Sequence, residues 1–110
     1  MDNLEVYVKE FSITPGSRYR TEGEKAHSGQ EFREEFLEPK FLNVKDSDKK
    51  LIVNLDGTIG YGTSWLEEVF GGLARKYGHK LVSEKLEFIS EEEEYLIDDI
   101  KQYIANAEKY

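Results

Sequence analysis

The sequence predicts one α/β domain, in which a small mixed sheet of four strands carries about three helices. Short apolar segments of strand length alternate along the chain with longer segments whose apolar residues recur at helical spacing. Serine residues stand directly before the helical segments, where a hydroxyl can cap a helix. The 110 residues suffice for one core, and no repeat or linker divides them, so we expect a single domain over residues 1–110.

The N-terminal part of the chain predicts two strands. Residues 4–11 (LEVYVKEF) alternate between apolar and polar side chains, as a half-buried strand does. A Pro-Gly pair at 15–16 marks a turn, and residues 17–21 follow as a short second strand.

A helix is predicted from Ser28 onward. Ser28 and Glu31 fit a capping box, and Phe32 and Phe36 lie one turn apart on one face. Pro39 lacks the N–H group that a helix interior requires, so we expect it to end or distort this helix.

The centre of the chain predicts a buried strand and an amphipathic helix. Residues 51–55 (LIVNL) form an apolar run, and residues 64–77 carry a wide apolar stripe that includes Trp65. Gly71 and Gly72 interrupt the helix at a cost of about 1 kcal/mol each, so we expect a close packing contact there.

One strand and one helix are predicted for the C-terminal part. Gly78 fits the position just past the preceding helix. A strand centred on residues 86–89 follows, and Ser90 and Glu93 fit a second capping box that opens the last helix.

The most informative segment is the glycine-rich stretch GTIGYGTS at residues 57–64. It places the hydroxyls of Thr63 and Ser64 at a helix N-terminus, where such a group can cap the helix, hold an anion or be phosphorylated. Ser64 and Glu67 fit a third capping box, which predicts that Ser64 caps its own helix. A phosphate on Thr63 would lie near the positive end of the helix dipole.

The neighbours of these hydroxyls complete the candidate binding site. Gly60, Tyr61 and Gly62 form the turn before the helix, and Tyr61 is a candidate for an exposed contact. Asp56 either forms an Asp-Gly turn or acts at the end of the sheet. Trp65 belongs to the apolar stripe, which predicts that it packs in the core.

Several functions are disfavoured. Thr63 stands where a nucleotide-binding P-loop requires lysine. There is no cysteine, and the two histidines lack ligand-like spacing, so we expect no metal and no cofactor. No hydroxyl–histidine–acid arrangement can be read from the spacing, so we expect no enzymatic activity. No apolar run approaches about 18 residues, and the acidic N-terminus is unlike a signal peptide, so we expect a cytoplasmic protein without membrane contact.

Negative charge is concentrated toward the C-terminus. The net charge is −8, and residues 84–110 hold nine acids against three lysines. This balance disfavours direct nucleic-acid binding, which requires a basic face. Four consecutive acids either contact a basic partner or form the solvated first turn of the last helix: Glu91, Glu92, Glu93 and Glu94.

From Gly16 onward the sequence resembles the STAS-like domains of the DUF4325 family. The resemblance rests on GSRY at 16–19, SG-x-x-FR at 28–33, DG at 56–57 and GYGTSWLEEVFGGL at 60–73. More distantly it is similar to the STAS fold of anti-sigma-factor antagonists, which implies a small mixed sheet with helices packed against it.

The distant resemblance implies a phosphoswitch. In those antagonists a partner kinase, an anti-sigma factor with a histidine-kinase-like ATPase fold, phosphorylates a hydroxyl at the start of a helix and thereby releases the antagonist. An ungapped alignment from residue 55 to residue 66 places Thr63 on the phosphorylated position and Ser64 on the serine that follows. The aspartate of that motif is Gly62 here, and its glycine is Trp65.

Three functions therefore stay open. The leading hypothesis is a non-enzymatic regulatory module that binds a protein partner through residues 57–72 and is gated by phosphorylation of Thr63. The alternative is an acidic interaction protein whose C-terminal helix competes for a basic or nucleic-acid-binding partner. The third, ranked last, is a small-ligand or nucleotide binder that uses the glycine-rich stretch. The sequence does not indicate an oligomeric state.

Overall fold

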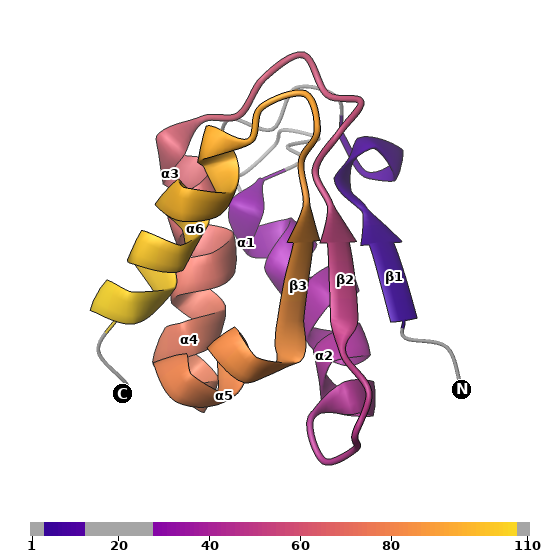
Figure 1. Ribbon diagram of the computed structural model, residues 1–110, viewed down its shortest axis with the longest axis vertical. Coiled ribbons are helices and arrows are strands. Elements are labelled where there is room, and N and C mark those ends of the chain that lie inside the picture. The colour runs from indigo at the N-terminus through magenta and orange to yellow at the C-terminus, as the bar shows by residue number, and fades with distance from the viewer. Residues whose placement is uncertain (1–3, 13–27, 108–110) are drawn as a thin grey trace.

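The computed structural model describes residues 4–12 and 28–107, and a parallel sheet forms its centre (Figure 1). The strands are β1 (Leu4–Tyr7), β2 (Leu51–Asn54) and β3 (Leu86–Ile89), which lie in sequence order. Both neighbouring pairs are parallel, so the described sheet is a parallel sheet and not the mixed sheet that the sequence predicted. The predicted fourth strand, residues 17–21, and the turn at 15–16 lie outside the described residues, so the described sheet has three strands. The α/β class is confirmed.

The first strand is shorter than predicted. The chain leaves the sheet after Tyr7 and makes a single 3₁₀ turn (Val8–Glu10), in which the amides of Phe11 and Ser12 both donate to the Val8 carbonyl. The side chain of Val8 is fully buried. The 3₁₀ turn thus keeps Val8 in the core while it turns the chain away from the sheet.

The first helical segment is capped as predicted and contains a π turn. Its parts are α1 (Gly29–Phe32), a π turn (Arg33–Leu37) and α2 (Glu38–Val44). The Ser28 Oγ accepts a hydrogen bond from the Glu31 amide at 3.1 Å. Pro39 lies in the first turn of α2, directly after the π turn. Pro39 therefore distorts the helix rather than ending it, because the π turn shifts the backbone hydrogen bonds around it.

The second helical segment also contains a π turn and is followed by a helix that the sequence did not predict. Its parts are α3 (Thr63–Leu66), a π turn (Glu67–Gly71) and α4 (Gly72–Tyr77). Gly78 ends it, as predicted, with a φ of 98°. The additional helix is α5 (His79–Lys85), in which Val82 is the buried residue. A helix of two turns that buries one apolar side chain gives no periodic signal.

The last helix begins later than predicted. α6 (Tyr95–Asn106) follows a turn in which the Ser90 Oγ donates to the Glu93 carbonyl at 2.7 Å. Ser90 therefore stabilises a turn before the helix, and the second capping box is wrong. Among the described helices, none has both the length and the apolar character that crossing a membrane requires.

The helices of the two crossovers, α1 to α2 and α3 to α5, lie on one face of the sheet, and α6, which follows the last strand, packs against the second helical segment and α5. The inner face contributes its side chains to the core: Leu4, Val6, Leu51, Val53, Leu86 and Phe88. On the outer face, Glu5 of β1 and Glu87 of β3 are exposed. Ile52 of β2 lies between them at the same register position. Successive crossovers of one hand in a sheet that follows sequence order bring every crossover helix to the same side. Figure 1 shows α1 and α2 behind the strands accordingly.

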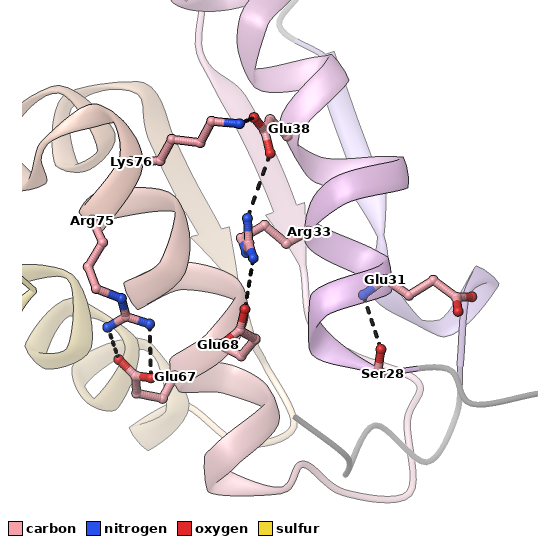
Figure 2. Close-up of polar contacts among 8 residues, drawn as sticks. All are labelled: Ser28, Glu31, Arg33, Glu38, Glu67, Glu68, Arg75 and Lys76. Atoms are coloured by element: carbon pink, nitrogen blue, oxygen red, sulfur yellow. Dashed lines mark hydrogen bonds and ion pairs between the residues drawn. The ribbon is translucent and has the colours of Figure 1, made fainter. Parts of the chain in front are cut away.

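A largely buried ion pair joins the first two helical segments. Arg33 NH2 donates to Glu68 Oε2 at 2.8 Å. Figure 2 shows the guanidinium of Arg33 between Glu68 and Glu38, and Glu38 also pairs with Lys76. A Cβ at Gly72 would lie 2.8 Å from Arg33 Nε. The close contact predicted for the glycine pair in this helix is therefore confirmed at Gly72.

We expect Gly29→Ala to destabilise the fold and Gly71→Ala to be tolerated. A Cβ at Gly29 would lie 2.8 Å from the Trp65 carbonyl oxygen, which is backbone and cannot rotate away. Such overpacking costs about 1–3 kcal/mol. A Cβ at Gly71 meets only the carboxylate of Glu67 and the guanidinium of Arg75, which are partly exposed and can move. Urea denaturation of both variants measures the difference, and equal stabilities would contradict the close helix contact.

The ion-pair network predicts a pH-dependent contribution from Glu38. Burial opposes its ionisation, but hydrogen bonds from Lys76 and Tyr77 and the charge of Arg33 outweigh that effect and hold the pKa of Glu38 below its ordinary value of 4.5. A lowered folded-state pKa gives stability above the unfolded-state value, which is lost as the pH falls through the folded-state pKa. Glu38→Gln should therefore be less stable than wild type at neutral pH, and the gap should narrow below about pH 4.5. The measurement is the free energy of unfolding of both proteins by urea denaturation at several pH values. A difference between them that stays constant with pH would contradict this expectation.

Candidate functional site

Two loops meet at the edge of the sheet where β2 and β3 end. The glycine loop (residues 55–62) connects β2 to α3, and the acidic loop (residues 90–94) connects β3 to α6. Figure 1 shows both at the top of the molecule, beside the first turns of α3 and α6. The carboxyl edge of parallel strands is where α/β proteins commonly place their binding sites. The two surfaces that the sequence presented as alternatives are therefore neighbours.

Asp56 fastens the two loops together. Its carboxylate oxygens accept hydrogen bonds from the amides of Glu91 at 3.1 Å and Glu92 at 3.0 Å. In return, the Gly57 amide donates to Glu92 Oε1 at 2.6 Å, and Gly57 has the positive φ of 91° expected in an Asp-Gly turn. Charged acceptors make the stronger class of hydrogen bond. Asp56 thus forms the predicted turn and joins the two loops, and a functional role for it at the end of the sheet stays a prediction.

Tyr61 is half-buried and stabilises the glycine loop instead of forming an exposed contact. Its hydroxyl donates to the Leu55 carbonyl at 2.7 Å, and its ring lies 5.7 Å from that of Trp65. Burial raises the pKa of Tyr61 well above its ordinary value, and the nearby carboxylate of Asp56 acts in the same direction. Trp65 is fully buried, as predicted. The side chain of Tyr61 therefore shapes the loop.

Thr63 and Ser64 are both exposed, but neither caps the helix. α3 begins at Thr63, and the N-cap is Gly62, whose carbonyl accepts from the amide of Trp65 at 3.1 Å. The third capping box is therefore wrong, because Ser64 lies inside the first turn rather than before it. In the part of the chain that the structure describes, no hydrogen bond involves either hydroxyl. Both remain accessible to another molecule.

The tip of the glycine loop carries Ile59, a residue that the sequence reasoning missed. Its side chain is 78% exposed, the largest value among the large apolar side chains of the described residues. Gly60 beside it faces open space, because a Cβ there would meet nothing within 4 Å. The sequence signal for this residue was an isoleucine in the segment GTIG at 57–60, which belongs to no strand-like or helix-like apolar pattern.

The acidic loop presents carboxylates to solvent. Glu91, Glu92 and Glu94 are exposed and Glu93 is half-buried. All four precede α6, so the sequence interpretation as the first turn of that helix is wrong. The hydroxyl of Tyr95 donates to the Glu93 carboxylate. Within residues 4–12 and 28–107, none of the four takes part in an ion pair, and no group of three His, Asp or Glu side chains is arranged to hold a metal.

A family model covers both loops. The model of the STAS-like domain of unknown function (DUF4325) matches residues 28–96, from the cap of α1 into the first turn of α6. Searches of curated proteins and of solved structures gave no match. The match spans more than half of the chain, and it confirms the resemblance that the sequence motifs indicated.

Removing the carboxylate of Asp56 should loosen the two loops. We expect Asp56→Ala to lower the free energy of unfolding by about 1–2 kcal/mol, because two amide hydrogen bonds to a charged group are lost. Hydrogen exchange at the Glu91 and Glu92 amides should accelerate. Asp46→Ala is the matched control, since the Asp46 carboxylate is mostly exposed and pairs only with Lys45. Unchanged exchange at these two amides would show that Asp56 does not join the loops.

Proposed function

Because the chain belongs to the family of STAS-like domains of unknown function (DUF4325), we propose that it is a non-enzymatic regulatory module that binds a protein partner through residues 57–72. The observation that carries the proposal is the pair of exposed hydroxyls on Thr63 and Ser64, beside the exposed Ile59. An exposed apolar side chain can be buried against another protein, and hydroxyls on the same surface can form hydrogen bonds with polar groups of that protein.

The construction of the glycine loop supports a binding role. The carboxylate of Asp56 accepts hydrogen bonds from two amides of the acidic loop. The hydroxyl of Tyr61 donates to the carbonyl of Leu55, the residue that directly follows β2. A loop that is already ordered loses little conformational entropy when a partner binds. The contact residues are thus presented in one arrangement before the partner arrives.

Phosphorylation of Thr63 is the gating step that we propose. Thr63 is exposed at the first position of α3, where a kinase can reach its hydroxyl. A phosphate adds a charge of about −2, and it would join the carboxylates of the acidic loop at the same edge. A phosphate that the partner covers would have to lose its hydration water, which weakens binding. The resemblance to anti-sigma-factor antagonists supports a histidine-kinase-like ATPase as that partner.

The alternative function uses the acidic loop alone. Its support is the exposure of Glu91, Glu92 and Glu94 without ion pairs in the described part of the chain. Binding to a basic partner would then weaken steeply with salt and would be insensitive to changes at Thr63. No observation at the glycine loop favours nucleotide binding.

Thr63→Glu should weaken partner capture by at least about tenfold, because the carboxylate would have to lose its hydration water when a partner covers position 63. The measurement is a pull-down from the native host with wild-type, Thr63→Glu and Ser83→Glu baits, read by mass spectrometry. Ser83 is the matched control, since it is exposed on α5 at the opposite end of the molecule (Figure 1). Urea denaturation confirms that all three baits are folded.

The outcomes distinguish control of binding at Thr63 from partner binding itself. A partner that wild type and Ser83→Glu capture and Thr63→Glu loses would support the switch. Equal capture by all three baits would reject gating at Thr63 but not the binding role. If wild type captures no partner, the proposed function fails.

A further inference from the structure

The glycine loop exposes an aliphatic side chain that the fold does not use. Ile59 is 78% exposed, so the fold gains little from burying this apolar side chain. A second apolar group stands at the same edge, since Tyr95 opens α6 and is 60% exposed. Single exposed apolar residues are ordinary on protein surfaces. Here, however, the exposed residue sits on a loop that is held in place.

The position of Ile59 is fixed from both sides. On one side, the Gly57 amide donates to Glu92. On the other, the hydroxyl of Tyr61 donates to the Leu55 carbonyl. These contacts hold the residues that flank Ile59, so its side chain is presented at little entropic cost to a binding partner.

The sheet edge that carries Ile59 also carries exposed carboxylates, and the Glu92 carboxylate accepts a hydrogen bond from the Gly57 amide of the same loop. The acidic loop contributes three exposed glutamates, and its backbone binds Asp56 next to the glycine loop. Lys9 is the cation that the described residues place against the glycine loop, where its side chain lies near Gly57. An apolar centre with a charged rim is the usual anatomy of a protein interface. Complementarity then requires positive charge around the partner's contact point.

We propose that this edge docks on a protein surface with an apolar pocket bordered by lysine and arginine, and that Ile59 fills the pocket. The inference rests on the proposed function and specifies the chemistry of the partner. It joins the two hypotheses that the sequence kept apart, since the glycine loop supplies the apolar anchor and the acidic loop supplies the charged rim.

Crosslinking tests the proposal directly. The full chain is expressed in its native host with photoreactive benzoylphenylalanine in place of Ile59, and the crosslinked partner peptide is sequenced. Leu42 is the matched control position, because it is a half-exposed leucine on α2, away from this edge (Figure 1). We expect crosslinking from position 59 and not from position 42, to a segment rich in apolar residues with lysine or arginine beside them.

Affinity measurements with the sequenced partner segment, made as a synthetic peptide, complete the test. Ile59→Ser should weaken binding at least about tenfold and Leu42→Ser should not, because only Ile59 would be buried. Affinity for wild type should fall with added salt. The combined variant Glu91→Gln, Glu92→Gln, Glu94→Gln should lower the salt dependence while it leaves the effect of Ile59→Ser in place.

Every other result would contradict a specific part of the inference. A partner captured in the Thr63-dependent pull-down but not crosslinked from position 59 would reject Ile59 as the anchor and leave the proposed function standing. A crosslinked segment without basic residues, or binding unaffected by salt, would reject the stated partner chemistry. No partner in either experiment would reject the proposed function together with the inference.

Discussion

The order of the three parallel strands is the constraint on which the described structure depends. Because β1, β2 and β3 follow one another in sequence, each crossover lies on the same face, and the helices of both crossovers share that face. The same order makes the loops that leave β2 and β3 emerge side by side. The glycine loop and the acidic loop are therefore neighbours as a consequence of topology, although more than thirty residues separate Asp56 from Glu91 and Glu92.

The Arg33–Glu68 ion pair specifies how the first two helical segments meet. Such a pair contributes little net stability, because removing both charges from water offsets their attraction. Its effect is on register, since the guanidinium fits only where Gly72 leaves room beside it. Because α1 packs against α3, the contact between the two helical segments also positions the start of α3, where the candidate site begins.

Local sequence patterns predicted the features that depend on neighbouring residues. The cap at Ser28, the end of a helix at Gly78 and the burial of Trp65 all follow from residues within one or two turns. The same patterns failed at Ser64 and Ser90, because serine followed by glutamate three residues later is a frequent coincidence in a chain with 23 acids. The contacts of Asp56 have no local signature, so sequence reasoning found both loops but not their contact.

The correction at Ser64 strengthens the case for a switch at this edge. A serine that capped α3 would contribute about 1 kcal/mol to the helix, and modifying it would disturb the fold as well as the surface. Gly62 occupies the N-cap position instead and uses only its backbone. A phosphate on Thr63 would therefore remove no capping bond, and it would lie at the positive end of the helix dipole. A change of charge at Thr63 would consequently leave the capping of the helix intact.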